Sequence, residues 1–170
     1  MTNQDRREPL MTKVKTMALA VVLALATLNA ASAPASAGGT AVPIKGTGTG
    51  AISFDPATGT FTGEESGVSS HLGKYTLRLQ GVGARSADGN ITGSGTVTIV
   101  AADGDRLTGT FTLTGDGQTQ RVVVTITGGT GRFAYASGTL TVICVSGPPR
   151  QEGQMLVLQH ACTLKGEISP

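Results

Sequence analysis

Histidine and cysteine are scarce in this chain of 170 residues, which has two of each. It contains no His-Glu-x-x-His and no Cys-x-x-Cys, and its few histidines and cysteines are too sparse for a finger-like zinc site. A Gly-x-Ser-x-Gly sequence, the nucleophile elbow of many serine hydrolases, is also absent. These absences argue against a metal site and against a serine hydrolase of that type, and no cofactor is expected.

An excess of positive charge is also missing once the N-terminal segment is set aside. Of the 13 basic and 11 acidic side chains, four and two fall in residues 1–37, which leaves nine of each in the remainder. The remainder has no run of arginine or lysine. Because phosphate neutralisation supplies most of the affinity for nucleic acid, no nucleic-acid partner is expected, and neither is a surface for anionic lipid.

Residues 1–37 have the parts of a secretory signal. A basic segment comes first, with Arg6, Arg7, Lys13 and Lys15. An apolar run from Met17 to Leu28 follows, and the small residues 35–37 form a site that signal peptidase accepts. The apolar run is shorter than the ~20 residues that cross a bilayer, so no stable membrane anchor is expected. The protein is therefore predicted to be secreted or periplasmic.

Two details of this signal stay open. Cleavage is predicted after Ala37, because the rival cut after Ala33 would put Pro34 next to the cleaved bond, where its fixed backbone fits poorly. Translation could begin at Met1 or at Met11, since Met11 keeps both lysines ahead of the apolar run. Residues 38–44 are then a short linker before one domain, residues 45–170, which is long enough for a single core.

Glycine, by contrast, is abundant, and all 25 glycines follow residue 37. That density favours short strands with tight corners and argues against long helices. Apolar and polar residues alternate with a period of two, as in 75–80 and 107–114, and the polar side is mostly threonine. Turn sequences separate eight such runs: 45–54, 59–65, 71–82, 91–101, 106–114, 119–127, 136–146 and 155–168.

Eight strands joined by short loops predict an all-β fold, an eight-stranded antiparallel β-barrel with almost no helix after the signal. An open sandwich is the alternative, but it would need long crossing connections that the short, regular loops do not favour. Two of the runs, 122–126 and 140–145, are apolar on both faces. They should be covered on both sides, and a contact between subunits would provide this cover.

The segment 126–138 is a glycine-rich corner between two strand patterns. Gly129, Gly131 and Ala134 match part of a dinucleotide-binding fingerprint, but that fingerprint needs a following helix, whereas another strand pattern follows. A structural role is therefore predicted, in which the glycines make the bend, Phe133 closes the barrel end, and Arg132 binds a carboxylate or backbone carbonyls. The residues given this role are Gly128, Gly129, Gly131, Arg132 and Phe133.

Three segments, 67–76, 109–112 and 127–138, resemble secreted bacterial proteins of the allene oxide cyclase barrel-like group. The last segment contains the Gly-Gly-Thr-Gly-x-Phe corner that is similar to one in plant dirigent proteins, which share a related barrel. The resemblance covers most of residues 45–168. It implies an eight-stranded antiparallel barrel with an apolar cavity, often assembled as a trimer, but no particular reaction, because one fold hosts many functions.

The candidate catalytic residues are His160, Tyr75 and His71. His160 shares the apolar face of the last strand with Leu158, and His71 has the parity of Tyr75, so both histidines are predicted to face the lumen. Either could act as a general base or orient a ligand. The candidate partners are Tyr75, Tyr135, Glu64 and Glu65. The alternative, which is favoured, is a buried histidine held by a backbone carbonyl or water. The expected lumen residues are Leu77, Leu79, Phe111 and Leu158.

The two cysteines, Cys144 and Cys162, are predicted to form a disulfide, because the chain is exported and both lie on apolar faces of the last two strands. The bond would close about 17 intervening residues and contribute about 3 kcal/mol in the loop-entropy model. One observation opposes it. A hairpin symmetric about Arg150 would place Cys144 near Leu156 instead, unless the second strand bulges.

Two functions are compatible with these features. The first is an exported barrel that binds a small apolar molecule or serves as a structural module. The second is a cofactor-free cyclase or isomerase that folds a flexible apolar substrate in the lumen. The first is favoured, because no paired catalytic constellation can be named. A lumen cavity of roughly several hundred Å³ beside His160 or a tyrosine would be compatible with ligand binding and with catalysis. A lumen filled by side chains would exclude both.

Overall fold

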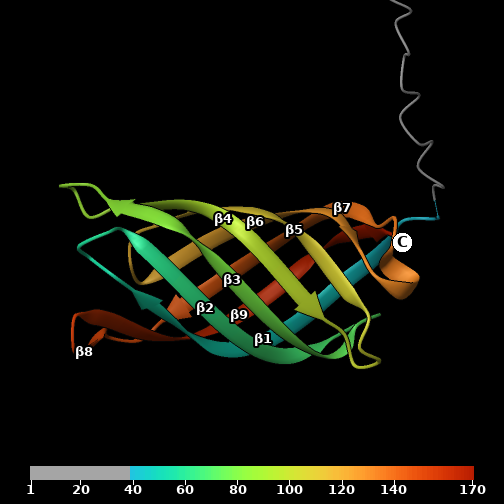
Figure 1. Ribbon diagram of the computed structural model, residues 1–170, viewed down its shortest axis with the longest axis horizontal. Helices are drawn as coiled ribbons and strands as arrows, with labels where there is room; N and C mark the ends of the chain where they lie inside the picture. The colour runs from blue at the N-terminus through green and yellow to red at the C-terminus, as the bar shows by residue number, and fades with distance from the viewer. Residues whose placement is uncertain (1–38) are drawn as a thin grey trace, which may run out of the picture. The chain divides into compact units, whose positions relative to one another are not determined.

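The structure is a computed structural model that describes residues 39–170. The predicted secretory signal, its cleavage site and the start codon lie outside these residues. The described part consists almost entirely of strands (Figure 1). They are β1 (Val42–Phe54), β2 (Thr60–Ser69), β3 (Gly73–Arg85), β4 (Ile91–Val100), β5 (Arg106–Gly115), β6 (Thr119–Gly129), β7 (Ser137–Ser146), β8 (Arg150–Glu152) and β9 (Met155–Ser169). Within residues 39–170, no helix is long and apolar enough to cross a membrane.

Eight of these strands form a closed antiparallel barrel, because β1 pairs with β2 on one side and with β9 on the other. The order around the barrel is β1-β2-β3-β4-β5-β6-β7-β9. The seam between β1 and β9 runs along the whole of β1, from Val42 opposite Ile168 to Phe54 opposite Leu156. The predicted eight-stranded antiparallel barrel is confirmed. The sequence did not predict β8, which pairs only with the start of β9 and lies outside the barrel.

The period-two pattern sorts side chains between the inside and the outside of the barrel. In β5, Leu107, Phe111 and Leu113 are buried, whereas the threonines between them are exposed. The same alternation runs through β2 and β6, so the inner faces of the strands meet in one core. This arrangement follows from strand geometry, since successive side chains point to opposite faces of a sheet.

Many strand boundaries differ from the predicted ones by one to four residues. β1 begins at Val42, so residues 42–44 of the predicted linker belong to the barrel. β2 continues to Ser69, four residues past its predicted end. β3 begins at Gly73 instead of residue 71, because His71 has a positive φ angle of 64° in the tight turn before it. A positive φ ends an extended strand.

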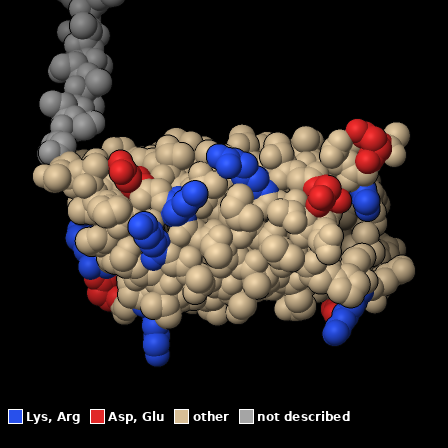
Figure 2. All heavy atoms as spheres, turned by 180° about the vertical axis from the view of Figure 1, so that it is seen from behind, with Lys and Arg blue, Asp and Glu red and all other residues tan. Residues whose placement is uncertain are grey.

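The outer faces of β6 and β7 are not covered by other parts of residues 39–170. Val145 is 54% exposed, and Val123 and Ile143 are half-buried. A single copy of the chain therefore leaves these outer faces open, and their cover by a contact between subunits stays a prediction. The outer surface has few charges, and Figure 2 shows wide uncharged areas between separate Lys, Arg, Asp and Glu side chains on one face.

The glycine corner closes one end of the barrel. A three-residue 3-10 helix, η1 (Gly131–Phe133), connects β6 to β7 and turns the Phe133 ring into the core, where it is 3% exposed. Gly131 has a φ of 57°, and a β-carbon there would overlap the carboxylate of Asp105. Glycine is therefore required for both backbone shape and space.

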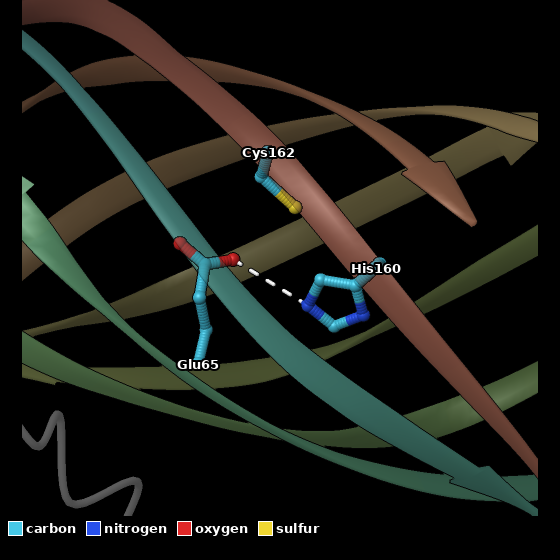
Figure 3. A group of neighbouring side chains, drawn as sticks. All are labelled: Glu65, His160 and Cys162. Atoms are coloured by element: carbon cyan, nitrogen blue, oxygen red, sulfur yellow. Dashed lines mark ion pairs between the residues drawn. The ribbon is translucent and has the colours of Figure 1, made fainter. Parts of the chain in front are cut away.

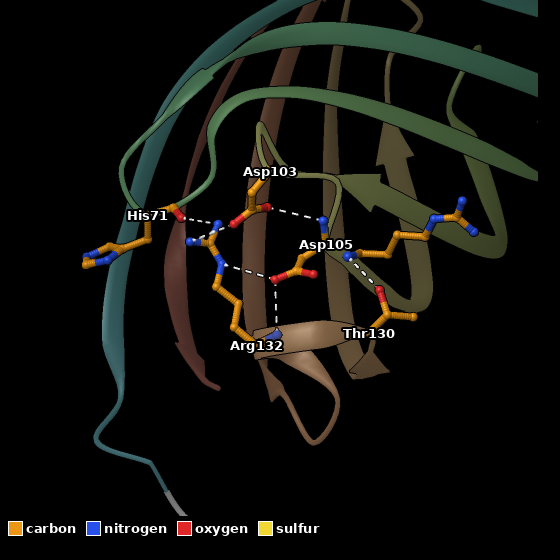
Figure 4. A network of polar contacts seen from close by, with 6 residues as sticks. His71, Asp103, Asp105, Thr130 and Arg132 are labelled. Atoms are coloured by element: carbon orange, nitrogen blue, oxygen red, sulfur yellow. Dashed lines mark hydrogen bonds and ion pairs between the residues drawn. The ribbon is translucent and has the colours of Figure 1, made fainter.

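Arg132 fastens this corner to two neighbouring turns (Figure 4). Its guanidinium group lies 3.1 Å from Asp103 Oδ2 and 3.9 Å from Asp105 Oδ2, and it donates a 2.9 Å hydrogen bond to the carbonyl of His71. The Arg132 backbone N–H also donates to Asp105. Arg132 thus contacts both carboxylates and a backbone carbonyl, and it stacks on the Phe133 ring at 4.6 Å.

Candidate ligand-binding cavity

A cavity of about 600 Å³ opens at the end of the barrel opposite the glycine corner. The ends of β1 and β3, the turn after β5 and the segment between β7 and β8 surround its mouth. Its lining is mainly apolar and includes Ile52, Phe54, Phe61, Leu113, Leu156 and Leu158. Polar side chains also reach it, among them the buried pair Gln120 and Ser146, whose hydroxyl donates a 2.9 Å hydrogen bond to Gln120 Oε1.

Glycines occupy inner positions of β3 and β4 near the open end, and one of them, Gly83, lines the cavity. Gly81 pairs with Gly95, and Gly83 pairs with Gly93, where the alternation would otherwise place inward side chains. Eight-stranded barrels are just wide enough for side chains to fill. Without side chains on Gly83 and Gly93, the Phe61 ring packs directly over the backbone of β3 and β4 and forms part of the cavity wall.

The predicted lumen residues all lie on the inner side of the barrel. Leu158 lines the open cavity. Leu77, Leu79 and Phe111 line a smaller space of about 30 Å³ farther in, together with His160. Ile52, Leu113 and Gln120 line both spaces, so the two are neighbours along the barrel axis.

A buried polar cluster, formed by Glu65, Tyr75 and His160, lies at the inner end of this system. The Tyr75 hydroxyl donates a 2.5 Å hydrogen bond to Glu65 Oε1. His160 Nε2 lies 3.6 Å from Glu65 Oε2, and the two side chains are 5% and 6% exposed (Figure 3). The structure thus brings together two of the predicted catalytic residues, His160 and Tyr75, with one predicted partner, Glu65.

The backbone of β1 makes room for this cluster. β1 lies between β2 and β9, and Gly50 is opposite Glu65 on one side and His160 on the other. Gly46, Gly48 and Gly50 occupy consecutive inward positions, and a β-carbon on Gly48 would overlap Glu65 Oε1 and the Tyr75 hydroxyl. The glycines let side chains from β2, β3 and β9 meet across β1.

Sequence reasoning missed the role of these three glycines, although their signal is visible. Thr47 and Thr49 separate them, so glycine recurs with the period of a strand and leaves one face without side chains. Such a strip marks a place where other groups approach the backbone closely.

Burial raises the pKa of Tyr75 well above its usual value, and the hydrogen bond to Glu65 raises it further. Both causes disfavour the phenolate, which would carry a negative charge away from water and next to a carboxylate. Tyr75 therefore remains a neutral hydrogen-bond donor to Glu65 over the ordinary pH range.

The other predicted site residues lie outside the lumen. His71 is exposed in the β2–β3 turn, so the prediction that it faces inward is wrong. The period of two does not extend past a turn residue with positive φ. Tyr135 is 76% exposed next to the glycine corner, and Glu64 faces outward, where it pairs with Arg78 at 3.0 Å. Parity along β2 separates Glu64 from Glu65, which faces the lumen.

Cys144 and Cys162 form the predicted disulfide, with an S–S distance of 2.05 Å. They are direct partners in the β7–β9 register. The hairpin symmetric about Arg150 is wrong, because β8 extends the first arm and the chain reverses near Gly153, which has a φ of 63°. Moving the centre of symmetry to Gly153 aligns the two cysteines.

The disulfide also affects what the polar cluster can bind. One potential ligand atom from each of Glu65, His160 and Cys162 lies within 4.8 Å of the others. The Cys162 sulfur is bonded to Cys144 and is not a thiolate, which is the form of cysteine that binds metals. With the disulfide formed, the group offers one carboxylate and one imidazole.

Comparison with known proteins found no protein family that matches the chain and no significant match to a characterised protein. The resemblance to the allene oxide cyclase barrel-like group therefore stays a prediction based on the quoted segments.

Proposed function

We propose that the protein is an exported barrel that binds one small apolar molecule in the open end of its lumen. The observation that carries the proposal is the cavity of about 600 Å³ with its mainly apolar lining. Pockets that enclose small molecules commonly have volumes of about 300–1,000 Å³ and combine apolar walls with a few polar groups. The Gln120–Ser146 pair and the neighbouring His160 are such groups.

Export is part of the proposal. It is supported by the signal-like sequence of residues 1–37 and by the Cys144–Cys162 disulfide, since disulfides persist mainly in oxidising compartments. Membership of the allene oxide cyclase barrel-like group and assembly into a homo-oligomer, a trimer by that resemblance, belong to the same proposal. The exposed apolar side chains on β6 and β7 are compatible with a contact between copies.

A cofactor-free cyclase or isomerase is the second candidate, and the polar cluster is the observation that favours it. Glu65 and His160 are two titratable side chains within 3.6 Å of each other inside an apolar lumen. Such a pair could move a proton to or from a bound substrate. In that case Glu65→Gln should abolish turnover but leave apolar-ligand binding in place.

Binding can be tested with N-phenyl-1-naphthylamine, an uncharged dye whose fluorescence rises in apolar sites. We expect a saturable rise with the wild-type protein and at least about a tenfold weaker affinity in Leu158→Arg, because the guanidinium group would enter the cavity. Val145→Arg, on the exposed outer face, is the matched control and should bind as the wild type does. Absence of binding, or equal binding by Leu158→Arg, would contradict the proposal.

A further inference from the structure

His160 Nδ1 is a buried polar atom without a partner. Among residues 39–170, it is the one fully buried side-chain nitrogen or oxygen that makes no hydrogen bond. Its Nε2 atom faces Glu65, and Figure 3 shows Nδ1 on the opposite side of the ring, away from the carboxylate. Buried polar atoms usually have a hydrogen-bond partner, and leaving one unpaired is unfavourable. A bound molecule would supply the partner.

The position of His160 connects it to the open cavity. Leu158 precedes it by one inward position on β9, and Ser146 is its direct partner on β7; both line the cavity. Two residues along a strand correspond to about 7 Å, so His160 lies about that far from Leu158 along β9. The space of about 30 Å³ beside His160 is large enough for a water-sized group.

The charge of Glu65 limits what that group can be. A carboxylate at Nδ1 would bring a second acid into an apolar lumen near Glu65, where like charges repel strongly. A hydroxyl is uncharged and can both donate and accept, so it satisfies Nδ1 whether or not that nitrogen carries a proton. Gln120, whose Oε1 accepts from Ser146, also lines this space and brings a second uncharged polar side chain to it.

We propose that the cavity selects an uncharged apolar alcohol, which places its hydroxyl at His160 Nδ1 and its hydrocarbon part toward the mouth. This inference depends on the proposed binding function and specifies the chemical class of its ligand. It assigns His160 as a ligand-binding residue, with Glu65 and Tyr75 as positioning residues that hold the ring through Nε2.

The test is displacement of N-phenyl-1-naphthylamine by three molecules with the same chain length: 1-decanol, decane and, near neutral pH, decanoate. We expect 1-decanol to displace the dye about tenfold more effectively than the other two, in line with one buried hydrogen bond. His160→Phe keeps a ring of similar size and should lose this preference. His71→Asn, which tolerates a positive φ, changes the exposed histidine and should keep the preference.

A second measurement uses only the wild-type protein, so it does not require that any variant folds. Nitrogen-15 NMR of the histidine-labelled wild-type protein should show a shift of the His160 Nδ1 signal with 1-decanol and none with decane. Equal displacement by all three molecules, a preference that survives His160→Phe, or an unchanged Nδ1 signal at saturation would overturn the inference while leaving the binding function intact. Failure of the dye to bind at all would overturn both.

Discussion

Gly48 on β1 lies so close to the Tyr75 hydroxyl that a β-carbon at position 48 would overlap it. The absence of a side chain on one strand thus allows a hydrogen bond between the next two, since Tyr75 on β3 reaches Glu65 on β2 in the space above Gly48. The Tyr75–Glu65 hydrogen bond therefore requires glycine at position 48.

Gly48→Ala should lower the free energy of unfolding by about 2 kcal/mol, because the added methyl group overpacks the cluster. Urea denaturation followed by circular dichroism would measure this change. Thr49→Ala alters the next, outward-facing residue of β1 and should change stability by less than about 0.5 kcal/mol. Equal stability of Gly48→Ala and the wild type would show that the cluster has free space.

Tyr75 should resist ionisation in the folded protein. Its pKa is raised in the folded state, so the folded protein holds this proton more tightly than the unfolded chain does. The stabilisation is fully present below the unfolded pKa of about 10 and is lost as the pH rises above that value. In Tyr135→Phe, Tyr75 is the only tyrosine, so ultraviolet absorbance reports its ionisation alone.

We expect tyrosinate absorbance in that variant to appear together with loss of the fold, and to appear near pH 10 when the protein is denatured beforehand. Circular dichroism over the same titration provides the control. Ionisation of Tyr75 near pH 10 in a protein that is still folded would contradict the burial of its hydroxyl.

The disulfide should stabilise the barrel by lowering the conformational entropy of the unfolded chain. Cys144→Ala combined with Cys162→Ala should lower the free energy of unfolding by about 3 kcal/mol, since the bond joins residues 18 positions apart. Urea denaturation of the double variant and of the wild type, with and without a dithiol reductant, would measure the effect. If the oxidised wild type and the double variant unfold at the same urea concentration, the bond contributes nothing.

At the glycine corner, the buried Phe133 ring should contribute more to the free energy of unfolding than the charge of Arg132 does. Phe133→Ala should cost about 4 kcal/mol, because it leaves a cavity where a 3% exposed side chain was packed. Arg132→Met should cost only about 1 kcal/mol, since Arg132 and Asp103 are each 45% exposed and water weakens their attraction. Thermal unfolding would compare the two, and Arg78→Met, in an exposed pair with Glu64, should have almost no effect. A larger loss in Arg132→Met than in Phe133→Ala would reverse this ranking.

The barrel could be predicted because its signals are local. Alternating threonine and apolar residues mark each strand, and Asp or Gly residues mark the turns, as in β5 and the turn that precedes it. Features set by contacts between distant strands could not be predicted in this way. The turn that exposes His71 depends on a backbone angle, and β8 pairs through the folded position of β9.

In the candidate site, too, local features could be predicted from the sequence and contacts between distant strands could not. Parity predicted that His160 and Tyr75 face inward, because each belongs to a strand with clear alternation. Their meeting with Glu65 depends on which strands are neighbours and on the registers across β1. A single sequence does not specify those registers until the closure of the barrel is known.

The seam between β1 and β9 has a consequence for the order of events during synthesis. These strands are the first and the last of the barrel, so the closing contacts join residues separated by nearly the whole domain. No nascent chain can complete the seam before Met155–Ser169 has emerged, and Glu65 cannot meet His160 until then. Because this seam closes the longest loop of the domain and forms last, the cavity and the polar cluster should be assembled late in folding.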